Sequence, residues 1–248
     1  MTSRQVVDAV KKDYPNEKVG YVGTLDPMAN GLLLIVTGKD TKRVEELVSL
    51  PKEYEFKVLF GIKTDSGDIL GKNLKFKIKN LKLNITFAKL NTTIKFFRGN
   101  LVQTVPLFSS IKYKGRELHK WGREGKINDV GLLKRKVTIH EIELLNFYSL
   151  PHSAFKNMVF SKLALLDVKS GKMFRLDEVL ESWQNFFKVF KSGLPYPVAK
   201  IRATVSRGTY IRSLAEDIGK RLGADSMCLS IKRTKVGSYE IGDLSKKD

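Results

Sequence analysis

The chain has 248 residues and a formal net charge of +19, from 45 Lys and Arg against 26 Asp and Glu. A hydrophobic content of 42%, with 10% aromatic residues, suffices for a folded core and excludes a disordered polycationic tail. The length suits one large domain or two small ones. The positive charge favours a polyanionic partner, although a generally basic proteome would give the same excess.

Several classes of protein are excluded by what the sequence lacks. One cysteine, Cys228, excludes an intramolecular disulfide and indicates a reducing compartment, so a cytoplasmic protein is expected. His119, His140 and His152 lack metal-ligand spacing, so no metal is expected. No apolar run is long enough to span a membrane, and no signal-peptide core follows Met1. Phosphate-loop and dinucleotide motifs are absent, so an enzyme of this sequence would need no cofactor.

The first half of the chain predicts a mixture of helices and strands. Ser3 can cap a short helix, and a glycine-rich segment at 20–31 runs into an apolar strand at 32–36. The elements expected next are a helix at 41–48, a strand at 54–60, a polar turn at 64–68, a half-buried strand at 72–84, a helix at 85–97 and a strand at 99–105.

The second half continues the mixture without a regular βαβ alternation, which favours the α+β class. Asp177 opens an amphipathic helix that Gly193 can end, and Gly223 ends a later helix that follows the turn at 206–209. The other elements expected are an extended segment at 110–113, a helix at 116–123, and strands at 137–145, 162–168, 198–205, 229–231 and 236–241. The best candidate for a domain boundary is 192–197.

Three segments carry residues suited to chemistry. Asp26 stands between glycines and before Pro27, which favours an extended backbone and a carboxylate projecting into a cleft. Tyr54 lies on a strand and could act as an acid, a base or a stacking platform. Arg212 follows the turn at Gly208 and could pair with a carboxylate or bind phosphate at a helix start. The alternatives are a plain turn aspartate, a half-buried strand aromatic and a surface arginine.

A fourth segment combines cations with aromatic rings. The residues concerned are Lys112, Tyr113, Lys114, Arg116, Lys120, Trp121 and Arg123. Cations bind phosphates and aromatic faces stack on bases, so the segment fits nucleic-acid binding as well as an ordinary solvated basic helix.

These segments resemble, in the same order, those of TruB-type tRNA pseudouridine synthases. Residues 20–31 are similar to the family signature Gly-x-x-Gly-x-Leu-Asp-Pro-x-Ala-x-Gly. Tyr54 with 61–68 resembles the second motif, 97–118 the middle segment and 208–219 the third motif. The likeness runs nearly end to end, and four ordered motifs are far more specific than one.

The resemblance implies the α+β pseudouridine synthase fold, a mixed, largely antiparallel sheet with flanking helices and a central RNA-binding cleft. It implies one catalytic domain over 1–248, with 146–197 an extended insertion of unknown role. The implied reaction isomerises one uridine of tRNA, typically position 55 in the T-loop, to pseudouridine by base flipping and without a cofactor. The implied partner is the T-arm of tRNA, with no membrane and a monomeric protein.

The resemblance also assigns roles to residues. Asp26 matches the catalytic aspartate, Tyr54 the tyrosine that stacks on the target base, and Arg212 the arginine that pairs with the aspartate. The implied substrate contacts are Tyr210, Ile231 in an apolar pocket, Tyr21 where many relatives have His, and Lys112 of the basic segment. Extruding the base costs a few kcal/mol, of which stacking on Tyr54 returns about 1–3 kcal/mol.

The sequence departs from the family pattern at both ends. It is expected to lack the first motif segment, of which only Thr2 and Ser3 remain, and the C-terminal RNA-binding domain of many relatives. Two other functions stay open: a tRNA-binding or RNA-folding protein with vestigial catalysis, and a synthase for a different RNA uridine.

Overall fold

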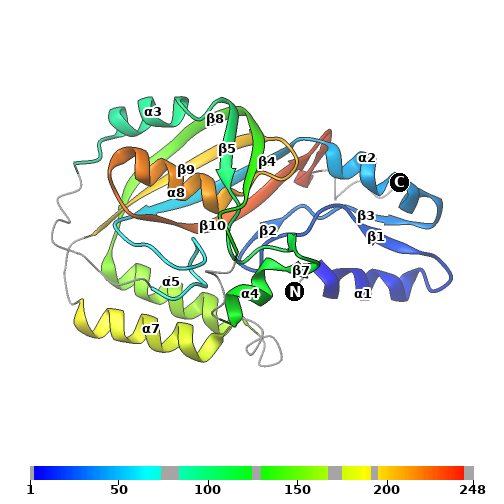
Figure 1. Ribbon diagram of the computed structural model, residues 1–248, viewed down its shortest axis with the longest axis horizontal. Coiled ribbons are helices and arrows are strands. Elements are labelled where there is room, and N and C mark those ends of the chain that lie inside the picture. Colours follow the sequence, from blue (N-terminus) through cyan, green and yellow to red (C-terminus); the bar gives the residue numbers. More distant parts are fainter. Residues whose placement is uncertain (1–2, 74–83, 125–129, 167–174, 191–194, 243–248) are drawn as a thin grey trace.

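The computed structural model describes residues 3–73, 84–124, 130–166, 175–190 and 195–242. Within these ranges seven strands form one sheet, with helices packed around it (Figure 1). The order across the sheet is β11 (Tyr239–Glu240), β10 (Ser226–Val236), β4 (Lys52–Phe60), β9 (Tyr196–Val205), β8 (Lys134–Leu150) and β5 (Gly99–Thr104), with β2 (Asn30–Gly31) beside β10. All pairings are antiparallel except that of β2 with β10. The predicted α+β class with a mixed, largely antiparallel sheet is confirmed.

One face of the sheet is covered by α8 (Ile211–Leu222), with α3 (Phe87–Lys95) beside it (Figure 1). The apolar residues of α8 recur every three to four positions, and Leu214 and Ile218 are fully buried against the sheet. Gly223 follows in the left-handed conformation, with φ +75°, and ends the helix as predicted. This packing, chiefly against β10, fixes the first turn of α8 and therefore Arg212.

A smaller unit forms around the N-terminal segments. It contains α1 (Ser3–Asp13), β1 (Val19–Tyr21), β3 (Ile35–Thr37), η1 (Gly38–Arg43) and α2 (Val44–Ser49). The strands β1 and β3 pair with each other, and Val22, Leu32, Val36, Leu47 and Val236 form a second apolar cluster beneath them. The strand predicted at 32–36 is shorter than expected, because Leu32 donates its N–H to Arg233 on β10 and only the residues from Ile35 join β1.

Helices α5 (His152–Ala164) and α7 (Leu176–Val189) pack together at one end of the sheet (Figure 1). The amphipathic helix predicted from Asp177 is confirmed. The strand predicted at 162–168 is wrong over 162–166, and 167–168 lie outside the described residues. Phe155, Val159 and Leu163 are spaced four residues apart and fully buried, so this stretch buries one face of a helix up to Ala164. Aromatic rings of Phe155, Trp183, Phe187 and Tyr196 fill the space between the two helices and β9.

The remaining predictions agree with the structure in most places. The segment predicted as a helix at 116–123 begins as β7 (Arg116–Glu117), which pairs with β6 (Lys112–Tyr113), and becomes α4 (Leu118–Arg123) only afterwards. Most of the strand predicted at 72–84, and the helix end predicted at Gly193, lie outside the described residues. Across the described ranges, none of the helices combines the length and the apolar character required to cross a membrane.

Candidate active site

Asp26 lies in the loop between β1 and β2. Its backbone carbonyl accepts from Ala29 N–H at 2.8 Å, and the preceding Leu25 N–H donates to the Ser3 hydroxyl at the start of α1. Gly31, with φ +105°, ends the loop where a Cβ would stand 2.2 Å from the Arg233 carbonyl oxygen, so only glycine permits this approach to β10. The Asp26 side chain remains 32% exposed, which leaves its carboxylate open to a ligand.

Arg212 binds the Asp26 carboxylate in a bidentate pair. Its Nε donates to Asp26 Oδ2 at 2.9 Å and its Nη2 to Asp26 Oδ1 at 3.1 Å. Two backbone carbonyls hold the same guanidinium, that of Ser66 at 2.8 Å and that of Phe108 at 3.0 Å. Burial alone would lower the pKa of Arg212, but the neighbouring carboxylates raise it, so this side chain stays charged.

A second carboxylate, Asp68, lies behind the pair. Its Oδ2 is 3.6 Å from Arg212 Nε, and its Oδ1 accepts from the Ser66 hydroxyl at 2.7 Å and from Leu70 N–H at 2.9 Å. The side chain is only 6% exposed. Burial raises the pKa of Asp68, while the positive charge of Arg212 opposes that rise. The single positive charge of Arg212 therefore lies between one accessible carboxylate and one buried carboxylate.

Tyr54 is placed near Asp26 by β4, opposite Arg233 of β10. Arg233 is 1% exposed and donates to the carbonyls of Leu32 at 2.8 Å and Gly23 at 3.3 Å, on both sides of the Asp26 loop. Burial raises the pKa of Tyr54, and the charge and hydrogen bond of Arg233 oppose that rise. The phenol is therefore neutral at physiological pH and can stack on or hydrogen-bond to a ligand beside Asp26.

Tyr210 precedes α8 and interacts electrostatically with Asp26 and Arg212. Its backbone is fixed by the fully buried Gln103 side chain, which accepts from Tyr210 N–H at 3.0 Å and donates to its carbonyl at 3.3 Å. Burial raises the pKa of Tyr210 as well, so it too stays neutral. The structure thus gathers Asp26, Tyr54, Tyr210 and Arg212 from three distant parts of the chain.

The other residues predicted to contact the substrate lie on three different strands. Ile231 is buried on β10 opposite Phe56, on the same face of the sheet as Tyr54. Tyr21 is half-buried on β1 opposite Ile35, and Lys112 is exposed on β6. Within the described ranges, no hydrogen bond or ion pair joins any of these three predicted residues to Asp26.

Three residues of the site escaped sequence reasoning. Asp68 stood in a segment expected to be a polar turn, Gln103 in an expected strand, and Arg233 between the strands expected at 229–231 and 236–241. The signal available for two of them was their place in the family motifs, because Asp68 ends the segment that resembles the second motif and Gln103 lies in the middle segment. No local pattern distinguishes Arg233, whose burial depends on three separate segments.

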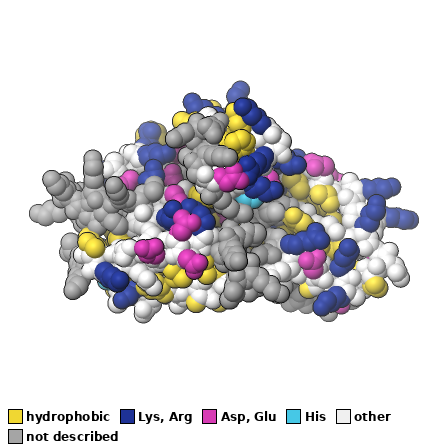
Figure 2. Space-filling model, turned by 60° about the horizontal axis from the view of Figure 1, so that its bottom comes forward, with side chains coloured by type: hydrophobic (Ala, Val, Ile, Leu, Met, Phe, Trp, Pro, Cys, Tyr) yellow, Lys and Arg dark blue, Asp and Glu magenta, His cyan; other side chains and the backbone are white. Residues whose placement is uncertain are grey.

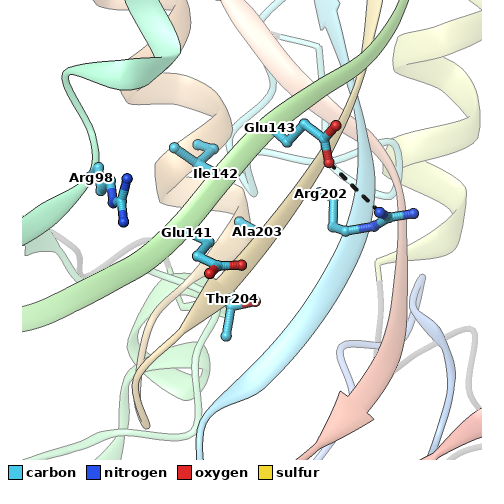
Figure 3. A pocket seen from close by; sticks show the side chains of 7 residues that line it. All are labelled: Arg98, Glu141, Ile142, Glu143, Arg202, Ala203 and Thr204. Carbon is cyan, nitrogen blue, oxygen red and sulfur yellow. Dashed lines mark ion pairs between the residues drawn. The ribbon is translucent and has the colours of Figure 1, made fainter.

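A pocket on the sheet lies away from this site (Figure 3). Its lining includes Glu143 and Arg202, which form an ion pair at 3.6 Å. Arg202 also binds Glu55, which follows Tyr54 on β4. Because successive strand residues point to opposite faces of a sheet, this charged pocket lies on the face of the sheet away from Tyr54. Among the described residues, no group of three His, Cys, Asp or Glu could hold a metal ion. The candidate active site is therefore the Asp26 cluster.

Solved structures with low sequence identity share this fold. A chain in the crystal structure of a Cbf5-Nop10-Gar1 complex matches with a TM-score of 0.55 and 22% identity, covering 97% of this chain and 46% of that one. A chain in the archaeal box H/ACA sRNP Nop10-Cbf5 complex gives 0.53 and 20%, covering 98% and 49%. The chain therefore has the pseudouridine synthase fold.

Sequence comparison narrows the assignment. The family model for the N-terminal domain of TruB family pseudouridylate synthases matches residues 11–161. The tRNA pseudouridine synthase B of Francisella tularensis subsp. tularensis (strain WY96-3418) is 33% identical over 98% of this chain, and that of Francisella philomiragia is 34% identical over 97%. This chain belongs to the TruB family. It spans 64% and 63% of the length of these relatives.

Proposed function

We propose that this chain isomerises a specific uridine of tRNA to pseudouridine, with position 55 of the T-loop as the first candidate. The observation that carries the proposal is the Asp26 carboxylate, one-third exposed and held by Arg212 beside two neutral tyrosines. The names of the relatives, which are tRNA pseudouridine synthases B, support the choice of substrate.

In the proposed reaction the bond between C1′ of the ribose and N1 of the uracil breaks, and a bond between C1′ and C5 forms. The proton leaves C5 and N1 gains one, so no oxidant, reductant or cofactor is required. Asp26 acts as the nucleophile or stabilises a cationic sugar, and Arg212 keeps its carboxylate ionised and oriented. The base must leave its stack to reach a site on this sheet, and Tyr54 provides a face on which it can stack.

The test is release of tritium from tRNA labelled at C5 of uridine, because the isomerisation exchanges that hydrogen. We expect release from a transcript with uridine at position 55 and only background from the matched transcript with cytidine there. Release from both transcripts would assign a different uridine, which mapping of pseudouridine would locate. Binding of tRNA without release from either would favour an RNA-binding protein with vestigial catalysis.

Positive charge on the surface supports a tRNA partner. Lys and Arg side chains gather on the side of α1 (the right of Figure 2). The exposed lysines of this part of the chain are Lys11, Lys12, Lys18, Lys39 and Lys42. No ion pair neutralises them within the ranges that the structure describes, so they remain available to phosphates.

The free thiol of Cys228 is buried, which fits the reducing environment of the cytoplasm, where we place the protein.

We expect the affinity for tRNA to fall steeply with salt, because phosphate contacts release counterions. With about four contacts, raising salt from about 50 to about 200 mM weakens binding on the order of 100-fold. Filter binding or fluorescence anisotropy across this range measures the slope. A slope near zero would contradict the proposal and would leave the +19 charge as a general property of the source proteome.

A further inference from the structure

The two carbonyls that hold Arg212 belong to two separate loops. Ser66 lies in the loop 61–73 after β4, and Phe108 lies in the loop 105–111 after β5. A small shift of either loop would move the guanidinium and, through it, the Asp26 carboxylate. The relative position of these loops therefore affects the geometry of the proposed catalytic group.

Arg175, immediately before α7, contacts both loops. Its Nη1 lies 3.0 Å from Asp65 Oδ2, next to Ser66 in the chain, and its guanidinium carbon lies 4.4 Å from the centre of the Phe108 ring. Both charged side chains are largely buried, Arg175 at 13% exposure and Asp65 at 18%. Asp65 also accepts from Lys72 N–H at 2.8 Å, which closes the loop on itself.

Helix α7 fixes Arg175 relative to the first loop. Trp183 Nε1 donates to the Ile69 carbonyl at 3.2 Å, and the Ser182 hydroxyl accepts from Asn73 N–H at 2.9 Å. Trp183 is fully buried and packs against the rings of Phe155 on α5 and Phe187 on α7. The helical part of 146–197, whose role the sequence leaves open, is therefore joined to the loop that carries Ser66 and Asp68.

We propose that Arg175 is a positioning residue, which joins the Ser66 and Phe108 loops so that Arg212 and Asp26 keep their bidentate geometry. This inference rests on the proposed function for its kinetic consequence. Arginine suits the role because its planar guanidinium can stack on Phe108 while it pairs with Asp65, whereas lysine can form only the ion pair well. In this proposal the segment 146–197 supports the active site through Arg175, without contacting the substrate.

The test replaces Arg175 with methionine and compares it with Glu178→Gln. Glu178 joins the same helix to the same loop through an exposed ion pair with Lys72, which contributes little. We expect Arg175→Met to lower kcat about 10- to 100-fold through misplacement of the catalytic group, with KM nearly unchanged. The kcat of Arg175→Lys should lie between those of Arg175→Met and the wild type. The kcat of Glu178→Gln should equal that of the wild type.

A second readout does not depend on catalysis. In protein with 15N-labelled arginine, the Arg212 Nε–H proton is held by Asp26 and should exchange slowly with water. We expect its exchange to become about tenfold faster or more in Arg175→Met and to stay unchanged in Glu178→Gln, since weaker local order opens such bonds more often. Unchanged exchange and kcat in the folded Arg175 variants would overturn the inference. Faster exchange in a protein without synthase activity would support it while refuting the proposed function.

Discussion

Replacing Asp26 with asparagine is expected to abolish turnover while tRNA binding and folding are retained. Asparagine is almost the same size and can still accept a hydrogen bond from Arg212. It is uncharged, so it can neither attack the sugar nor stabilise a cation there. Loss of such a group lowers kcat by at least about 10³-fold. Tritium release gives kcat, and anisotropy with labelled tRNA gives the affinity.

The fold should tolerate this change because Arg212 keeps other partners. Asp68, the Ser66 carbonyl and the Phe108 carbonyl still surround its guanidinium. Asp40→Asn is a matched control, since Asp40 is an exposed carboxylate with a 3.6 Å ion pair to Arg43. The control should keep full turnover. Undiminished turnover by Asp26→Asn would refute the proposed role of this residue.

Replacing Arg212 with methionine should cost both activity and stability. Asp26 would not be left as a buried unpaired charge, because its side chain is 32% exposed and can be solvated. The buried carboxylate is Asp68, at 6% exposure. Removing one partner of a buried charge pair costs about 3–5 kcal/mol. Unfolding in urea, followed by circular dichroism, measures the loss of free energy directly.

The loss should depend on pH in a defined direction. Burial raises the pKa of Asp68 above its unfolded value, and without Arg212 the pKa rises further. Between the unfolded and the folded pKa of Asp68, the folded state holds a proton that the unfolded state has released. The variant therefore loses stability as the pH rises through this window up to the folded pKa. Acidification should therefore reduce the difference in the free energy of unfolding between Arg212→Met and the wild type. Below both pKa values the contribution of this group disappears.

A second substitution separates the buried charge from other effects. Adding Asp68→Asn to Arg212→Met removes the stranded carboxylate and should recover part of the lost stability without recovering turnover. It should also remove most of the pH dependence of the difference. A double variant no more stable than Arg212→Met would show that Asp68 is not the source of the loss.

Local patterns predicted most elements because their causes are local. Alternation marked β4 and β9, and three-to-four-residue spacing marked α7 and α8, whichever segments they contact. The prediction at 162–168 was wrong over 162–166 because short alternation of leucines competed with the four-residue spacing of Phe155, Val159 and Leu163. Burial against α7 and β9 favours the helix, and a short window does not contain that information.

The sequence by itself determined the class of fold, and through its ordered motifs it pointed to Asp26, Tyr54 and Arg212. Only the tertiary structure decided that Arg212 pairs with both the accessible Asp26 and the buried Asp68. Arg212 meets Asp26 across 186 positions of the chain and Arg175 meets Asp65 across 110, and no local pattern records such contacts. Motifs depend on residue type and spacing, whereas burial and ion pairing depend on which distant segments pack together.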